Sequence, residues 1–265
     1  MAAAALSLVA AAGCESVNTT QGGTIGIDRT QRMSSLVSEQ QLDQQAVQLY
    51  QQTLSGARGK GQLNTNASQV ARVRTISQRL IGQVGVFRPD ATKWKWEVNV
   101  IDDKEVNAWC MPGGKIAVYT GLINTVKPTD DELAAVLGHE IAHALREHAR
   151  ERASEQMATS MGLSVLAAIT GSQASSDLGG ALANVMFGLP NSRLHETEAD
   201  RMGVELAARA GYDPRAAVTL WTKMGQVGGS APPEILSTHP SAESRIADLK
   251  QASEKVLPLY QQARR

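Results

Sequence analysis

Apolar residues recur with a helical period in two stretches of the first half of the chain. Between residues 34 and 52, and again between 66 and 84, they return at every third or fourth position, as in VARVRTISQRLIGQV. This spacing places them on one face of a helix. Residues 95–101 alternate between apolar and polar, and residues 115–122 follow a Pro-Gly-Gly turn. The pattern therefore predicts two amphipathic helices followed by two strands.

A third helical stretch, KPTDDELAAVLGHEIAHALREHARERASEQ, spans residues 127–156. Thr129 and Glu132 have the spacing of a capping box and stand just before an apolar run, which predicts that one long helix begins there. Further helices are expected over residues 192–210, 214–227 and 240–255. Residues 161–189 are apolar but interrupted by glycines, which favours a helical hairpin packed on the core over a partner-facing or membrane-facing surface.

The composition favours a helix-rich protein with a packed core. Hydrophobic residues make up 42% of the chain and aromatic residues only 4%. Such a content supports a core, and scarce aromatics suit helices better than a β-sandwich. We expect a predominantly helical α+β fold, with residues 34–265 in one domain. The 26 basic residues balance the 26 acidic ones, so no strong field favours nucleic acid and we expect no such partner.

The N-terminus resembles a bacterial lipoprotein signal. LSLVAAAGC is an apolar run that closes on small residues at Cys14, although Ala11 stands where leucine is commoner and the first basic residue is Arg29. We predict a signal peptide over residues 1–14 that ends at a lipidated Cys14. The alternative is an alanine-rich disordered end. Residues 15–33 are polar and rich in Gly and Thr, which predicts a flexible tether of about 25 Å. Cys110 is then left as a buried thiol.

The motif HEIAH, residues 139–143, predicts a zinc site. Residues four apart share one helical face, so His139 and His143 can bind the same ion. Zinc lowers the pKa of its water, and Glu140 can take the proton as that water attacks a carbonyl. Two histidines on a solvated helix face could produce the same five letters. The apolar flanks favour burial instead, and buried imidazoles and carboxylates need a partner such as a metal.

A catalytic zinc needs a third protein ligand, and the stretch RLHETEADR supplies candidates. Glu196 and Asp200 are four apart on one helical face, whereas His195 and Glu198 point about 100° and about 200° away from Glu196. We assign Glu196 as the third ligand and Asp200 as the acceptor that orients a zinc-bound imidazole. Acidic residues that merely decorate a helix start are the alternative. His195 and Glu198 are taken as bystanders.

His148 is a further candidate ligand that helical geometry disfavours. In one continuous helix it lies about 180° from His139 and about 140° from His143. It stands beside Arg146, Glu147 and Arg150. We therefore expect His148 to be a surface histidine.

Four segments carry a resemblance to metallopeptidase family forty-eight, the family of HtpX and the CAAX prenyl proteases. They are NAWCMPGGKIAVYTGL, LGHEIAHALREH, HETEADRMG and HPSAESR. The chain looks most similar to periplasmic lipoprotein members such as LoiP and BepA. The resemblance implies a zincin-like, or gluzincin, fold with a small sheet beside the HExxH helix. It also implies one zinc ion per chain, held by His139, His143 and Glu196.

The same resemblance implies roles for residues outside the zinc ligands. Asn107 and Ala108 match an edge strand that pairs with the substrate backbone. His239 matches a histidine near the zinc that either stabilises the oxyanion or occupies the open coordination position, and by spacing alone it is a helix-cap residue ahead of Pro240. Arg245 matches an arginine close to the site, and a solvated helix arginine is the alternative.

The implied function is a zinc endopeptidase of the bacterial envelope that acts in protein quality control on misfolded or misassembled envelope proteins. Glu15 follows Cys14 where an inner-membrane retention signal has Asp, so the resemblance implies a periplasmic enzyme held at the outer membrane by its lipid. The alternative is a non-proteolytic, zinc-stabilised lipoprotein that binds or chaperones partners. The intact Glu140 favours the enzyme.

Overall fold

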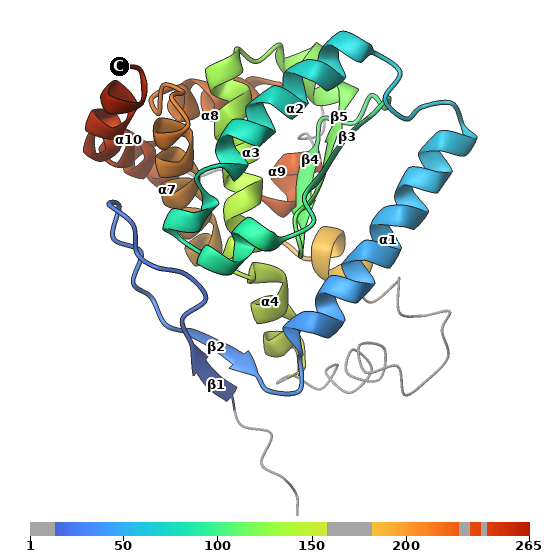
Figure 1. The fold of residues 1–265 in the computed structure, drawn as a ribbon, viewed down its shortest axis with the longest axis horizontal. Coiled ribbons are helices and arrows are strands. Elements are labelled where there is room, and N and C mark those ends of the chain that lie inside the picture. The colour runs from blue at the N-terminus through green and yellow to red at the C-terminus, as the bar shows by residue number, and fades with distance from the viewer. Residues whose placement is uncertain (1–13, 158–181, 228–233, 240–242) are drawn as a thin grey trace, which may run out of the picture.

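A three-stranded sheet and the helices that pack on it form the body of the molecule (Figure 1). The computed structural model describes residues 14–157, 182–227, 234–239 and 243–265. The strands are β3 (Glu97–Ile101), β4 (Ala108–Met111) and β5 (Lys115–Tyr119). β5 lies in the middle, parallel to β3 and antiparallel to β4. β4 is therefore an edge strand with one side free of strand partners among the described residues.

Eight α-helices are described, and α1, α2, α3 and α7 begin after residues whose side chains cap them. The eight are α1 (Glu39–Gly59), α2 (Ala67–Ile81), α3 (Asp130–Leu145), α4 (His148–Met157), α7 (Arg193–Arg209), α8 (Ala216–Gln226), α9 (Glu234–Thr238) and α10 (Glu243–Ala263). The predicted capping box of α3 is confirmed. The backbone N–H of Thr129 donates to Glu132 and that of Glu132 donates to Thr129, at 2.8 and 3.2 Å.

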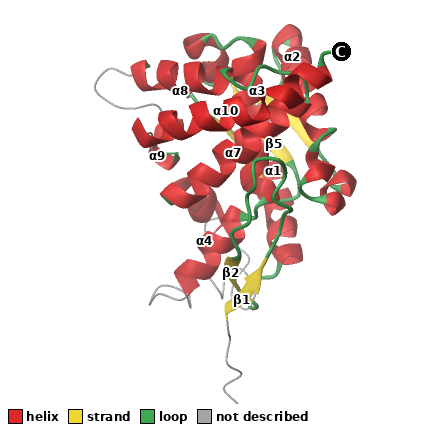
Figure 2. Ribbon diagram, turned by 90° about the vertical axis from the view of Figure 1, so that its left-hand side faces the viewer, coloured by secondary structure: helices red, strands yellow, loops and turns green. Residues whose placement is uncertain are grey.

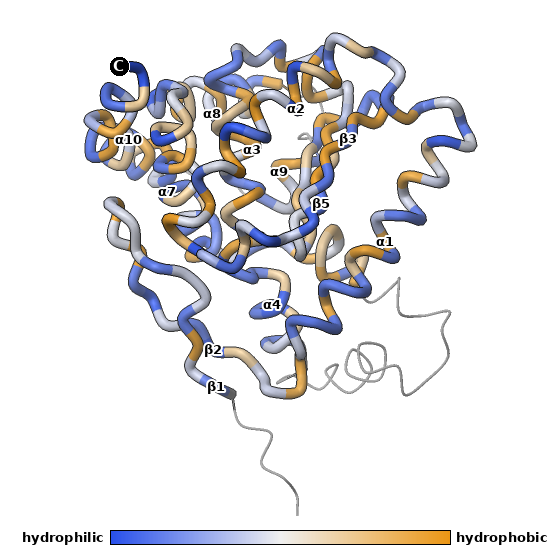
Figure 3. The backbone as a smooth tube through the Cα atoms, in the orientation of Figure 1, coloured by the Kyte–Doolittle hydropathy of each residue, from blue (hydrophilic) through white to orange (hydrophobic). Residues whose placement is uncertain are grey.

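Alternating strand residues fill two cores on opposite faces of the sheet. Trp109 and Ala117 pack with apolar residues of α1, while Cys110 and Ile116 pack with α2, α3 and α7. Figure 3 shows the apolar character of β3 and β5 between these helices. The predicted predominantly helical α+β fold, with a small sheet beside the HExxH helix, is confirmed. Cys110 is buried with a free thiol, as expected.

Helix α3 is the central element, and it crosses α7 at two glycines. Every residue from 132 to 145 is buried. A Cβ atom on Gly138 would lie 2.7 Å from the carbonyl oxygen of Gly203, and one on Gly203 would lie 2.6 Å from the backbone nitrogen of His139. Only glycine permits backbones to approach this closely. The contact therefore sets the distance between the two helices that carry the candidate ligands.

The single long helix predicted from residue 127 onward is wrong in its second half. Arg146 ends α3, Glu147 has a left-handed backbone with φ of 52°, and α4 begins at His148. Because one residue leaves the helical region, residues after 146 no longer follow the rotation of α3. The angles calculated for His148 on a continuous helix therefore do not apply.

The flexible tether predicted for residues 15–33 is instead packed against the body. β1 (Cys14–Val17) and β2 (Gln31–Ser34) pair as antiparallel strands, and this small sheet lies beside α4 (Figure 2). Ile25 and Ile27 are buried. The N–H groups of Thr24 and Ile25 donate to the carboxylate of Glu205 on α7, at 3.0 and 2.7 Å. Composition suggested a solvated chain, but these few apolar and backbone groups have partners far along the sequence.

Several expectations fall on residues that the structure does not describe. The signal peptide is outside apart from Cys14, the residue at which β1 starts. Most of the hairpin predicted for residues 161–189 is outside, as is Pro240. None of the helices in the described ranges is long and apolar enough to cross a membrane.

Candidate metal centre

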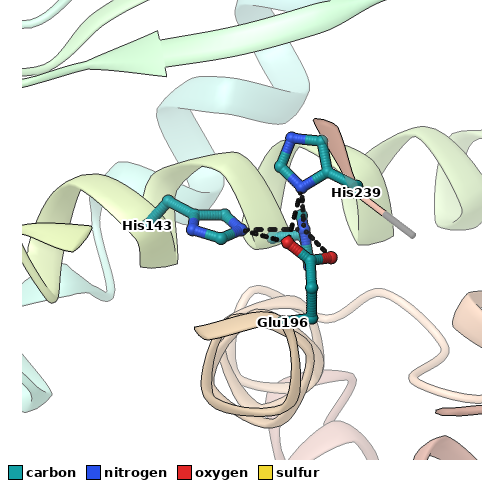
Figure 4. A group of neighbouring side chains, drawn as sticks. His143, Glu196 and His239 are labelled. Carbon is teal, nitrogen blue, oxygen red and sulfur yellow. Dashed lines mark hydrogen bonds and ion pairs between the residues drawn. The ribbon is translucent and has the colours of Figure 1, made fainter. Parts of the chain in front are cut away.

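Three histidines and a glutamate converge where α3, α7 and the end of α9 meet. His139 and His143 project from α3, Glu196 from the first turn of α7, and His239 directly follows α9. All four are buried. Figure 4 shows the rings of His143 and His239 directed at the Glu196 carboxylate. The helical phase that selected Glu196 over its neighbours agrees with this arrangement.

The donor atoms have the separations that a zinc ion requires. Nε2 of His139 lies 3.0 Å from Nε2 of His143 and 3.1 Å from Nδ1 of His239. Oε1 of Glu196 lies 3.4 Å from Nε2 of His143 and 2.9 Å from Nδ1 of His239. Ligands about 2.0–2.1 Å from a tetrahedral zinc ion are separated by about 3.3–3.4 Å. The four groups can therefore hold a metal, and their donor types suit zinc.

Asp200 and Arg245 fix the orientation of His139. Nδ1 of His139 lies 2.9 Å from Oδ1 of Asp200, so a proton on Nδ1 leaves the Nε2 lone pair directed at the centre. The Arg245 guanidinium donates to both oxygens of Asp200, at 2.5 and 2.8 Å, and lies 3.6 Å from the ring centre of Trp221. Both side chains lie beside the candidate metal ligands. Arg245 is buried, so the solvated alternative is wrong.

His148 is not a surface residue, and it contacts the other candidate ligand. It is fully buried, and its Nδ1 lies 2.8 Å from Nδ1 of His143. Its Nε2 lies 3.1 Å from Oε2 of Glu198. The helix break at Glu147 turns His148 back toward α3, which is why the continuous-helix geometry failed. Burial lowers the pKa of His148 well below its usual value, with added repulsion from the neighbouring histidines and arginines.

His195 and Glu198 are likewise not bystanders. His195 stacks on His148, with ring centres 4.4 Å apart, and its Nε2 lies 3.1 Å from Glu151. Glu198 accepts hydrogen bonds from Arg146 and from Arg29 of the N-terminal segment. Helical phase was right that both lie off the Glu196 face. Helical phase alone could not show that His195 and Glu198 point into a second buried cluster, which contains His148 and Glu151.

The charges of the carboxylates dominate the protonation of the metal-free centre. Burial lowers the pKa of His139, but the nearby charges and hydrogen bonds of Glu196 and Asp200 outweigh it and raise the pKa to about 9. Burial raises the pKa of Glu196, yet the facing histidines hold it well below its usual range. Burial also lowers the pKa of His143. At neutral pH His139 is therefore protonated in the metal-free centre. Its positive charge balances the carboxylates, as a metal ion would.

We expect zinc affinity to increase with pH until His139 is neutral. A metal ligand must be unprotonated, and His139 has a pKa of about 9 without metal. The zinc dissociation constant should fall about tenfold per pH unit from pH 7 to 9 and level off above. Competition with a chromophoric chelator measures this. Asp200→Asn, which removes one charge that raises the pKa, should move the plateau to lower pH. Affinity that is constant from pH 7 to 9 contradicts the assignment.

Glu140 occupies the position of a general base. It is buried beside the donor cluster, and its Oε1 receives no hydrogen bond within the described ranges. Nε2 of His239 lies 3.7 Å from that oxygen. Burial raises the pKa of Glu140, although the neighbouring His239 and His139 oppose the change. A buried carboxylate with a raised pKa and an oxygen that receives no hydrogen bond is well suited to accept a proton from water.

A pocket connects Glu140 and His143 to the edge strand of the sheet. Asn107 and Ala108 line it, at the start of β4, as the resemblance implied. Asn107 is held by hydrogen bonds of its side chain to Glu105 and to the N–H of Ala108, at 2.8 and 2.9 Å. β4 therefore presents its edge toward the candidate metal centre.

Two further pocket residues were missed from the sequence. Arg152 on α4 is buried, donates to the carbonyl of Val185 at 2.9 Å, and also donates to the side chain of Asn191. Asn191 in turn lies 3.3 Å from Nδ1 of His239. Neither residue belongs to a recognisable spacing, so only the fold brings them to the site.

A buried helix with HExxH, beside a second helix that supplies a glutamate, defines the gluzincin class of metallopeptidase folds. Comparison with known proteins agrees, since residues 67–253 match peptidase family M48. The chain belongs to this family.

Individual relatives come from mitochondria and from bacteria. The mitochondrial metalloendopeptidase OMA1 of Arabidopsis thaliana is 40% identical over 169 residues, which are 63% of this chain and 34% of that protein. The Schizosaccharomyces pombe OMA1 is 37% identical, over 68% of this chain and 51% of its own length. The β-barrel assembly-enhancing protease of Escherichia coli is 28% identical, over 78% and 43%. The chain thus spans about a third to a half of these relatives, and the family alone does not fix a cellular location.

Proposed function

We propose that this protein is a zinc-dependent endopeptidase that holds one zinc ion through His139, His143 and Glu196. One observation carries the proposal. The three donors meet at ligand separations, while Oε1 of Glu140 lies beside them with no hydrogen bond in the described ranges, 3.7 Å from Nε2 of His239. A purely structural metal site has no use for such a base.

Each residue of the site has its own role in the proposed hydrolysis. Zinc in such a site supplies Lewis-acid chemistry, which lets water attack a peptide carbonyl at neutral pH. Glu140 accepts the proton of the attacking water and returns it to the leaving amine. Asp200 and Arg245 hold the His139 ring in place. The substrate backbone pairs with the edge of β4 near Asn107 and Ala108, which places the scissile bond beside Glu140.

We further propose that the enzyme works in the bacterial cell envelope on misfolded or misassembled proteins. The lipoprotein-like sequence that ends at Cys14 supports a periplasmic location with a lipid anchor in the outer membrane. The name of the E. coli relative, a β-barrel assembly-enhancing protease, supports a role in envelope protein quality control. Mass spectrometry of the mature N-terminus tests the anchor, because a diacylglyceryl cysteine has a diagnostic mass. An unmodified Cys14 would remove the anchor and leave the chemistry unaffected.

A closed, non-proteolytic metal site is the second candidate, and the position of His239 favours it. Nδ1 of His239 lies 2.9 Å from Glu196 and 3.1 Å from His139, in the place of a fourth donor. Four protein donors leave no position for water, which is typical of structural zinc sites. His239 must therefore move away before the site can act as an enzyme.

Cleavage of casein by purified protein with one equivalent of zinc tests both candidates. We expect wild type to cleave slowly and His239→Ala to cleave faster, because removal of the fourth donor opens the site. Glu196→Gln should lose zinc and be inactive in the same assay. If zinc-loaded wild type and His239→Ala are both inert, the endopeptidase proposal is wrong and the closed site is supported.

A further inference from the structure

The candidate ligand His143 is backed by a chain of hydrogen bonds that reaches the N-terminal segment. We propose that His148, Glu198 and Arg29 are positioning residues that hold His143 in the tautomer presenting Nε2 to the metal. This inference rests on the proposed function, in which His143 is a zinc ligand. The three residues come from α4, α7 and the segment between β1 and β2. Of the candidate zinc ligands they reach only His143, through the hydrogen bond of His148.

The position of the proton between the two imidazoles determines the tautomer of His143. Nδ1 of His143 and Nδ1 of His148 are 2.8 Å apart and buried, so one of them must donate to the other. Nε2 of His148 faces Oε2 of Glu198 at 3.1 Å. An ionised carboxylate only accepts, so the proton of neutral His148 lies on Nε2. His148 Nδ1 then accepts from His143 Nδ1, and Nε2 of His143 carries a lone pair.

Two arginines hold the Glu198 carboxylate in place. Arg29 donates to both of its oxygens, at 2.8 and 2.7 Å, and Arg146 donates to Oε1 at 2.9 Å. Arg146 is fully buried and Glu198 nearly so. Guanidinium groups only donate, and these two bind both oxygens of Glu198 and set the direction of the carboxylate. Glu198 therefore cannot act as the donor in its contact with His148.

A second metal ion does not fit among the residues around His148. His148, Glu151 and His195 come close enough to hold one. However, Glu151 already accepts two hydrogen bonds from Arg29 and one from Gln31. The Arg29 guanidinium lies 2.6 and 2.9 Å from the two Glu151 oxygens. It fills the space and supplies the positive charge that a metal ion would bring. This cluster therefore serves to position His148, on which the His195 ring stacks.

An isosteric pair of variants at His148 tests the chain. Asparagine can place its carbonyl oxygen where Nδ1 lies and accept from His143, whereas leucine of the same size cannot. Loss of such a partner typically weakens metal binding by about 10- to 100-fold. We expect His148→Leu to raise the zinc dissociation constant by that factor and His148→Asn to raise it less. Equal zinc affinity of the two variants, both shown to be folded by circular dichroism, overturns the proposal.

Glu198 and Glu151 provide a matched comparison within the cluster. Both are buried carboxylates bound by Arg29, but of the two only Glu198 is hydrogen-bonded to His148. Glu198→Gln should weaken zinc binding about 10- to 100-fold, less than the loss in Glu196→Gln, which removes a ligand. Glu151→Gln should weaken it less than Glu198→Gln at a similar change in melting temperature. The side chain of Arg29 is 24% exposed, so Arg29→Gln should fold and also weaken zinc binding. An effect of Glu151→Gln as large as that of Glu198→Gln contradicts the chain.

The ring nitrogens of metal-free protein give a direct readout that needs no zinc. Nitrogen-15 NMR distinguishes protonated from unprotonated imidazole nitrogens. In wild type we expect His143 to be protonated at Nδ1 and not at Nε2, and Glu198→Gln should mix the two tautomers. A wild-type His143 protonated at Nε2 overturns the inference. If the tautomer is as expected but wild type binds no zinc, the proposed function fails and the positioning chain remains.

Discussion

We expect Glu140→Gln to abolish peptide cleavage and to leave zinc binding intact. Glutamine keeps the size of the side chain but cannot accept a proton from water, and Glu140 is not among the groups at ligand distance in this centre. Loss of a general base typically costs about 10²- to 10⁴-fold in rate. Initial rates on a fluorogenic casein, with zinc content measured on the same sample, test the prediction. The assay should use the His239→Ala background if wild type is slow.

The control for this variant is Glu254→Gln, the same chemical change on an exposed residue of α10. It should cleave casein at the wild-type rate. If Glu140→Gln retains wild-type activity with full zinc, Glu140 is not the base and the mechanism proposed here is wrong. If it loses zinc as well as activity, its carboxylate has a structural role instead.

We expect Gly203→Ala to destabilise the protein strongly and to weaken zinc binding. The added methyl group would lie 2.6 Å from the backbone nitrogen of His139 and 2.8 Å from the carbonyl carbon of Gly138. Backbone atoms cannot rotate away, so α7 must separate from α3 and carry Glu196 away from the histidines. We expect a loss of about 3 kcal/mol, at the upper end for overpacked cores. The melting temperature should fall by roughly 10 °C, and the zinc dissociation constant should rise.

Gly225→Ala is the matched control for the helix crossing. Gly225 lies in α8, is exposed, and an added Cβ would meet no atom within 4 Å. Alanine at such a helical site should stabilise the protein by about 0.5–1 kcal/mol. Calorimetry of both variants with and without zinc gives the comparison. A Gly203→Ala protein that melts and binds zinc like wild type would show that the crossing does not set the ligand spacing.

The features predicted correctly from the sequence depend on local geometry. The capping box at Thr129 fixes where α3 begins, and the i, i+4 spacing then places His139 and His143 on one face. The same helical period places Glu196 and Asp200 on one face of α7 and their neighbours on other faces. These conclusions needed only the rotation of a regular helix, which is the same in every protein.

The features that were missed depend on contacts between distant segments. The break after α3 lies at Glu147, which adopts a left-handed conformation without glycine or proline to signal it. His148 therefore seemed to lie on the wrong face. Arg29 stands in a polar stretch with no apolar period, and its partners Glu151 and Glu198 lie more than a hundred residues away. Pairings of this kind have no signature in a single sequence.

The packing of the N-terminal segment has a consequence for the proposed lipid anchor. β1 begins at Cys14 itself, and its pairing with β2 and the ion pairs of Arg29 leave no slack between that cysteine and the body of the protein. With a lipid on Cys14, the protein would be held at a fixed distance from the membrane and in a fixed orientation. A flexible linker would instead let it move freely. The pocket beside β4 would then sample one layer above the lipid surface, and only polypeptides present in that layer would be within reach.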